Sequence, residues 1–226
     1  MKFYYYLFLF LLFSCNTEKD YDAFENKLKN LLKSHKGTFA IALKNMNDGK
    51  SVLINENEVF HAASTMKTPV MIEFFKKINE GKISSDDSLL INNEFSSIVD
   101  GSKFELSSFD DSDEDIYENL GKYISTDKLV YDMITRSSNF GTNLLIDYLN
   151  AEDVNNTMKN IGAKNMKVLR GVGDLKAFDL GLSNTTTAAD LLIIYEKLAM
   201  GEIVNNESSN KMIRILKDQV YNDIIP

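Results

Sequence analysis

Cysteine, histidine, proline and tryptophan are scarce in this chain of 226 residues. It contains one cysteine, two histidines, two prolines and no tryptophan. A single cysteine excludes an intramolecular disulfide, a CxxC redox pair and a cysteine-ligated metal site. With only His35 and His61 available, a Ser-His-Asp triad has little support. H-E-x-x-H, EF-hand and phosphate-binding glycine motifs are also missing, so we expect neither a metal ion nor a cofactor.

Basic residues are outnumbered by acidic ones. The chain has 25 Lys and Arg against 33 Asp and Glu, a formal net charge of -8, and no basic cluster. This balance argues against nucleic acid as a partner, because nucleic acid is bound by positively charged surfaces. Hydrophobic residues make up 44% of the sequence, a share typical of globular proteins. We find no internal repeat and no linker, and we predict one domain over residues 21–226.

The N-terminus has the pattern of an export signal. Met1-Lys2 is followed by an apolar run over residues 3–13 and then by Ser14-Cys15. The run is too short for a comfortable membrane-spanning helix, and its Leu-Phe-Ser-Cys ending resembles a bacterial lipobox. We therefore predict a lipoprotein signal peptide over 1–15, lipidation of Cys15 and a polar tether over 16–20. The protein would be exported and anchored to the bacterial membrane by its lipid, facing the periplasm or the cell exterior. The alternative is an ordinary cleaved signal with an incidental cysteine.

The hydrophobic pattern predicts several helices and one β-hairpin. Residues 21–36 are amphipathic and predict a helix. Two apolar runs, 38–43 and 51–54, flank an Asn-Asp-Gly turn signal and predict the hairpin. The acidic segment 84–117 predicts a solvated loop with short helical pieces, and the glycine-containing stretch 169–183 predicts irregular structure. Further helices are predicted from 64 to near 81, from 129 to 149 with a break at 136–139, and over 153–161, 185–198 and 208–221.

Ser64 and Lys67 form an S-x-x-K motif where the strand pattern gives way to a helix. Residues three apart lie on the same face of a helix, so Lys67 can reach the Ser64 hydroxyl. A serine hydroxyl needs an adjacent base to become a nucleophile, and a lysine with a lowered pKa can be that base. The same spacing at 125–128 and 208–211 lies in polar segments and is interpreted as chance. The alternative for Ser64 is a helix N-cap.

A polar tripeptide, Ser137-Ser138-Asn139, interrupts two apolar helical stretches. Polar side chains between buried segments are well placed to point into a cleft. Ser137 could relay a proton to a leaving group, and Asn139 could hydrogen-bond Lys67 or a substrate amide. The alternative is a capped junction between two helices.

In this order, the two motifs resemble the first two active-site motifs of class A β-lactamases and penicillin-binding proteins. Residues 60–67 are similar to the segment that leads to and contains the family's nucleophile. Residues 133–145 resemble its second motif, and residues 182–191 resemble the helix after its omega loop. The resemblance covers roughly residues 38–226. It implies an α/β (α+β) fold of the β-lactamase/transpeptidase type, with a helical domain and an antiparallel sheet of which only the N-terminal hairpin is present.

The resemblance also implies a reaction and roles for the motif residues. Ser64 would be the acylated nucleophile, with its backbone N–H forming half of an oxyanion hole. Lys67 would belong to the activating network, Ser137 would shuttle a proton, and Asn139 would orient the substrate and Lys67. The protein would be a serine hydrolase of the class A β-lactamase type that opens the cyclic amide of β-lactams. Alternatives are a D-Ala-D-Ala peptidase acting on peptidoglycan peptides, an esterase-like hydrolase, or a non-catalytic binding remnant.

Three features depart from the family pattern: two residues and one missing motif. Ser138 stands where class A enzymes typically carry aspartate. Val172 stands at the omega-loop glutamate that activates the deacylating water, and valine can neither orient nor deprotonate water. We therefore expect an acyl-enzyme that forms but turns over slowly, with Asp174 paired to Arg170 instead of replacing the glutamate. The third motif, K-T-G or K-S-G, does not follow Tyr221, and we expect this chain to be a C-terminally incomplete version of the fold.

Overall fold

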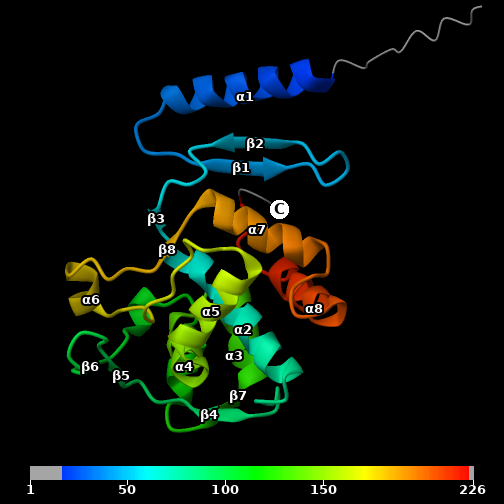
Figure 1. Ribbon diagram of the computed structural model, residues 1–226. Helices are drawn as coiled ribbons and strands as arrows, with labels where there is room; N and C mark the ends of the chain where they lie inside the picture. The colour runs from blue at the N-terminus through cyan, green and yellow to red at the C-terminus, as the bar shows by residue number, and fades with distance from the viewer. Residues whose placement is uncertain (1–16, 224–226) are drawn as a thin grey trace, which may run out of the picture.

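The computed structural model describes residues 17–223, so the predicted signal peptide and Cys15 lie outside the described residues. A β-hairpin lies at one end of the molecule, between the N-terminal helix α1 (Thr17–Lys33) and a group of packed helices (Figure 1). The predicted helix over 21–36 is confirmed, but it begins earlier and takes in residues 17–20 of the predicted tether. No helix within the described range is long and apolar enough to cross a membrane.

The predicted hairpin is confirmed. Strand β1 (Ile41–Lys44) pairs antiparallel with β2 (Ser51–Ile54), with Ile41 opposite Ile54. Gly49 adopts a positive φ of 73° in the turn, a conformation that glycine adopts without strain. Val52 and Ile54 are buried and the intervening Leu53 is exposed, as the two-residue period of a strand requires. Helix α7 (Ala188–Ala199) lies on one side of the hairpin and α1 on the other (Figure 1).

Helix α2 (Lys67–Asn79) is the centre of the hydrophobic core. Val70, Met71, Ile72 and Phe74 are fully buried, so this helix is covered on most of its circumference. Pro69 lies in its first turn, where a backbone N–H has no intrahelical partner to lose. The predicted helices are confirmed with shifted ends: α3 (Thr126–Thr135), α4 (Asn139–Leu149), α5 (Ala151–Ile161), α7 and α8 (Asn206–Lys217).

The structure has three further short strand pairs, two of which join segments that are distant in sequence. Strand β3 (Phe60–His61) pairs with β8 (Thr185–Thr186), and β4 (Ser88–Leu90) pairs with β7 (Tyr123–Ser125). Strand β5 (Phe95–Ser96) pairs with β6 (Lys103–Phe104). The sequence patterns did not predict these pairs, because strands of two or three residues have no measurable hydrophobic period.

The acidic segment 84–117 contains the predicted short helical pieces, η2 (Ser108–Asp110) and the start of η3 (Glu114–Asn119), but it is not the solvated loop that its composition predicts. Ile91, Phe95 and Ile116 belong to the hydrophobic core, and Asp111 and Asp113 are buried. The two carboxylates have partners on the segment that carries Ser137 and Asn139. The prediction was wrong for these residues because a high local charge does not exclude burial when hydrogen bonds and ion pairs compensate the charges.

Candidate active site

Ser64 lies in a 3₁₀ turn, Ala63–Met66, between β3 and α2. Two contacts hold the turn: the Ala62 N–H donates to the Asn184 carbonyl oxygen over 2.8 Å, and Thr65 Oγ1 donates to the Ala62 carbonyl oxygen. Ala63 has a positive φ of 45°, a strained conformation for a residue with a Cβ. The N-cap interpretation of Ser64 is wrong, because Met66 occupies the N-cap position of α2.

Ser137 and Asn139 lie where α3 passes into α4. Ser138 is the N-cap of α4, and its buried Oγ accepts a hydrogen bond from the Gly141 N–H over 3.0 Å. The capped-junction interpretation is therefore correct for Ser138. Ser137, with a positive φ of 59°, and Asn139 instead direct polar atoms at Lys67.

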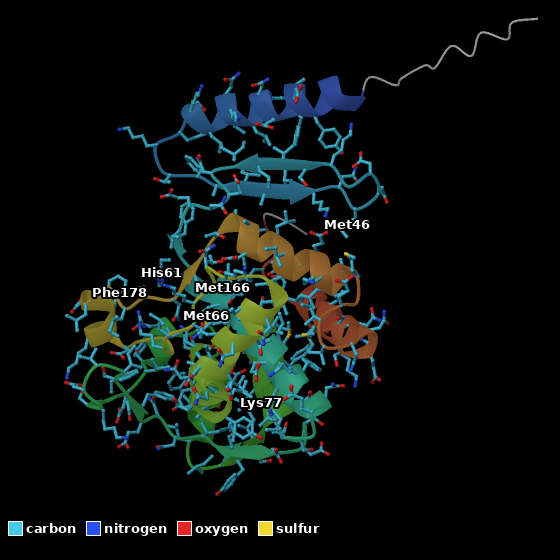
Figure 2. The ribbon with its side chains drawn as sticks, in the orientation of Figure 1. Met46, His61, Met66, Lys77, Met166 and Phe178 are labelled. Atoms are coloured by element: carbon cyan, nitrogen blue, oxygen red, sulfur yellow. The ribbon has the colours of Figure 1, made fainter. Side chains whose placement is uncertain are left out.

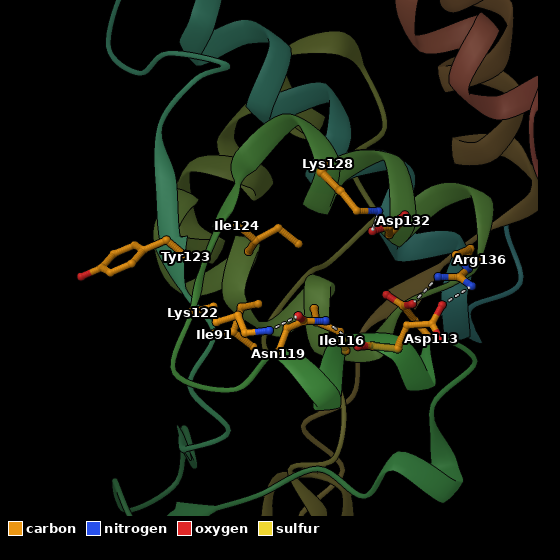
Figure 3. Close-up of a pocket in the computed structure, with 11 residues that line it drawn as sticks. Ile91, Asp113, Ile116, Asn119, Lys122, Tyr123, Ile124, Lys128, Asp132 and Arg136 are labelled. Carbon is orange, nitrogen blue, oxygen red and sulfur yellow. Dashed lines mark hydrogen bonds and ion pairs between the residues drawn. The ribbon is translucent and has the colours of Figure 1, made fainter.

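Arg136 fixes the chain just before Ser137. Its guanidinium group forms ion pairs with Asp113 Oδ1 at 2.7 Å and with Asp115 Oδ2 at 2.8 Å. Figure 3 shows Arg136 directed toward Asp113. Both residues line a pocket that Tyr123 also lines. The ion pairs tie the α3–α4 connection to the acidic segment, so the position of Ser137 depends on that segment.

Lys67 is 3% exposed and donates three hydrogen bonds. They lead to the Ser137 carbonyl oxygen at 2.8 Å, Ser137 Oγ at 2.9 Å and Asn139 Oδ1 at 3.0 Å. Ser64 Oγ lies 3.0 Å from Ser137 Oγ. The structure thus brings all four predicted residues together, but the Ser137 hydroxyl stands between Lys67 and Ser64. Burial lowers the pKa of Lys67 to about 8, and the charge of Asp111 opposes this shift.

Asp111 is a residue of this site that the sequence analysis missed. Its Oδ1 accepts from the Asn139 N–H at 3.0 Å and its Oδ2 accepts from the Phe140 N–H at 2.8 Å. A carboxylate at the N-terminus of a helix satisfies free N–H groups and interacts favourably with the helix dipole. Asp111 therefore holds the first turn of α4, and with it Asn139. No local signal identifies it, because a capping residue ordinarily adjoins its helix and Asp111 is distant in sequence.

A loop that contains Val172 forms the opposite wall of the site. The Asn143 side chain accepts from the Val172 N–H at 2.6 Å and donates to the Val172 carbonyl oxygen at 2.9 Å. Gly171 lies so close to this side chain that a Cβ would fall 2.3 Å from Asn143 Oδ1. Only glycine fits there without displacing Asn143, so the two residues together fix the position of Val172.

The expected ion pair between Arg170 and Asp174 is wrong. Asp174 accepts hydrogen bonds from Ser97 Oγ, the Ile98 N–H and the Ala177 N–H. Burial acts to raise the pKa of Asp174, but these hydrogen bonds, together with a smaller contribution from the charge of Arg170, outweigh it and leave the pKa lowered. Arg170 donates instead to the carbonyl oxygens of Leu182 and Gly171, both at 3.0 Å. The aspartate serves as the N-cap of α6 (Leu175–Asp179), a short helix within the stretch predicted to be irregular.

A cavity of about 410 Å³ opens between these elements. Ser64, Lys67 and Asn139 line one part of it, and Val172, Leu175 and Phe178 line another. A serine hydroxyl linked to a buried lysine through a second hydroxyl is a suitable arrangement for nucleophilic attack on a carbonyl group. Between residues 21 and 223, no group of three or more histidine, aspartate or glutamate side chains is placed to hold a metal ion.

The sequence and the fold define the class to which this chain belongs. Residues 23–226 match the model of the β-lactamase enzyme family, and the chain is a member of that family. Among curated proteins, none matches the chain.

Solved structures with a similar fold include PBP-A and several β-lactamases. PBP-A is 25% identical with a TM-score of 0.73, and the match covers 88% of this chain and 70% of PBP-A. A β-lactamase from Xanthomonas campestris pv. campestris is 18% identical with a TM-score of 0.75, covering 90% of this chain and 72% of its own. The TLA-3 extended-spectrum β-lactamase is 19% identical with a TM-score of 0.75, covering 91% and 74%. The predicted β-lactamase/transpeptidase-like fold is confirmed.

Proposed function

We propose that this protein is a serine hydrolase that opens β-lactam amides through an acyl-enzyme on Ser64. The observation that carries the proposal is the hydrogen-bonded chain from Lys67 through Ser137 to Ser64. The Ser64 hydroxyl attacks the carbonyl carbon, its proton passes to Ser137, and the Ser137 proton passes to neutral Lys67. When the C–N bond breaks, the proton returns through Ser137 to the departing nitrogen. Asn139 orients Lys67 and the substrate amide, and the Ser64 N–H donates to the oxyanion.

Hydrolysis of the acyl-enzyme is proposed to be slow. Water must attack the ester carbon, and a carboxylate that could remove its proton is replaced by Val172. Asn143 holds the Val172 backbone, and Asp174, the nearest carboxylate in the segment, is engaged by Ser97 and by the Ile98 and Ala177 N–H groups, so it does not take the glutamate's place. This property favours a second candidate function, a penicillin-sensitive peptidase that acts on peptidoglycan peptides. PBP-A supports this candidate, because one solved structure of a PBP-A mutant is an acyl-enzyme complex with penicillin G.

Intact-mass spectrometry after mixing with penicillin G tests the proposal. We expect a stoichiometric covalent adduct that persists, and its loss in Ser64→Ala. The matched control is Ser125→Ala, which alters another S-x-x-K serine and should keep the adduct. Complete absence of an adduct on the wild-type chain would favour a non-catalytic binding protein.

Val172→Glu tests why turnover is slow. A carboxylate at this position can activate water, so the adduct should form as before and decay roughly 100-fold faster, the lower end of what general-base catalysis contributes. Val172→Gln is the control, since glutamine has the same shape and cannot take the proton. Equal decay in both variants would show that space, and not a base, limits deacylation.

Export and lipidation of Cys15 remain part of the proposal. The lipobox-like sequence before Cys15 supports them. Cells that express the chain and grow with radiolabelled palmitate should yield a labelled protein in the membrane fraction. Cys15→Ser should abolish the label. A wild-type protein that is exported without label would show an ordinary cleaved signal.

A further inference from the structure

The cavity beside Ser64 has an apolar wall that the proposed chemistry does not use. Leu175 and Phe178 lie on α6, with 72% and 54% of their surfaces exposed. The Phe178 ring packs edge to face against His61, with ring centroids 6.3 Å apart (Figure 2). Both side chains and His61 line the same cavity as Ser64, Lys67 and Asn139. When a ligand covers large apolar side chains that were in contact with water, the free energy of the complex is lowered, because apolar surface is removed from water.

Helix α6 holds this wall in a fixed orientation. Ala177 is fully buried, and Asp174 caps the helix at the Ala177 N–H. Asp174 also binds Ser97 and the Ile98 N–H, which ties α6 to the segment around β5. With the inner side of so short a helix anchored, Leu175 and Phe178 remain on the side that faces the cavity. The wall is therefore built by the fold and needs no ligand to form.

A second hollow, of about 280 Å³, flanks Ser64 on its other side. Ser64 and Lys67 line both hollows, whereas Ser137 lines the second hollow and Asn139, Val172 and Phe178 line the first. In the proposed mechanism Ser137 returns the proton to the departing nitrogen, so the leaving group must lie on the Ser137 side. The acyl part of the substrate, on the other side of the scissile bond, then extends toward Val172 and Phe178.

We propose that Leu175, Phe178 and His61 bind an apolar, preferably aromatic, side chain on the acyl part of the substrate. The protein would thus select substrates in which the acyl part, on the carbonyl side of the scissile amide bond, carries an apolar or aromatic group. This inference rests on the proposed function, because it uses the direction in which the leaving group departs. The cavity volume of about 410 Å³ lies within the range of ligand pockets and accommodates a ring beside the reacting amide.

The test compares two penicillins that differ only in the acyl group on the side-chain nitrogen, phenylacetyl in one and acetyl in the other. The second-order rate of acylation of the wild-type chain should be about fivefold or more higher for the phenylacetyl compound, as expected for partial burial of a ring. Phe178→Ala should remove most of this preference, because the rate with the phenylacetyl compound falls toward the rate with the acetyl compound. Phe178→Tyr should retain it. Leu180→Ala is the matched control, because Leu180 is 64% exposed and does not line the cavity.

The outcomes separate this inference from the function on which it rests. If both penicillins acylate Ser64 at equal rates, or if Phe178→Ala slows both equally, the apolar wall is not the side-chain site and the hydrolase proposal stands. If neither acylates Ser64, both proposals fail. Leu175→Ala, at a more exposed position, repeats the test and should also reduce the preference; circular dichroism shows whether each variant is folded.

Discussion

At the scale of single residues, the protonation state of Lys67 decides whether Ser64 can lose its proton. Burial lowers the pKa of Lys67 to about 8, while the negative charge of Asp111 acts in the opposite direction. Only the neutral amine can accept a proton through Ser137. The rate of acylation should therefore rise with pH, reach half of its plateau near pH 8, where half of the Lys67 side chains are neutral, and level off above that midpoint.

Asp111→Asn tests this electrostatic contribution. Without the charge that raises the pKa of Lys67, the midpoint of the pH profile for acylation by penicillin G should move to lower pH. In the amide, an NH2 group that cannot accept replaces one of the two oxygens that bind the Asn139 and Phe140 N–H groups, so the free energy of unfolding should also fall by roughly 1–3 kcal/mol. The midpoint distinguishes the two effects, since a purely structural defect lowers the rate at every pH.

Asp115→Asn provides the comparison. Asp115 pairs with Arg136, as Asp113 does, but Asp115 is more exposed than Asp113. Its charge is not among the causes that shift the pKa of Lys67. This variant should keep the wild-type midpoint. A midpoint that stays unchanged in Asp111→Asn would mean that Asp111 only caps α4.

At the scale of secondary-structure elements, asparagine side chains hold the irregular segments in place. Asn93 exchanges two hydrogen bonds with the Leu106 backbone, Asn143 with Val172, and Asn155 with Val168. Asn184 does the same for the chain at Arg170. A carboxamide offers one acceptor and two donors, so it can pair with a peptide group as a neighbouring strand would. These contacts order loops that have no regular secondary structure of their own.

These contacts also explain what the sequence could and could not predict. The hairpin and the long helices follow from local periodicity and turn residues, and they are confirmed. The position of Ser64 where the strand pattern gives way to a helix and the break at Ser137 followed from the same patterns, although α2 begins only at Lys67. The strand pair β3–β8, the burial of Asp111 and the clamp on Val172 each join distant parts of the chain. No sequence window contains both partners of such a contact, and its energy arises only after folding.

Asn143→Ala should loosen the Val172 loop. Two hydrogen bonds are lost, each contributing about 1 kcal/mol, so hydrogen exchange of the Val172 amide should become roughly 10- to 30-fold faster. Exchange followed by mass spectrometry of peptides that contain residues 169–175 measures this effect. Asn210→Ala, on the exposed face of α8, should leave exchange in this loop unchanged. Equal protection in both variants would show that Gly171 and the surrounding chain hold the loop without the asparagine.

At the scale of the whole molecule, the candidate site rests on the hydrophobic core. The site draws on the turn before α2, the α3–α4 connection and the Val172 loop, and each continues into buried residues. Phe140, which directly follows Asn139, is fully buried and packs edge to face against both Phe95 and Tyr117. Its ring thus joins α4 to the acidic segment that supplies Asp111. Stability and the geometry of the site are therefore expected to change together when this contact is lost.

Phe140→Ala should lower the free energy of unfolding by about 3–5 kcal/mol, because a large buried side chain is replaced by a cavity. Phe109→Ala is the matched control: Phe109 is 95% exposed, so the change should stay within about 0.5 kcal/mol. Urea unfolding followed by circular dichroism measures both. The remaining folded Phe140→Ala protein should also react more slowly with penicillin G, since Asn139 and Asp111 lose their shared support. A destabilised variant that still reacts at the wild-type rate would show that the first turn of α4 keeps its position through Asp111 alone.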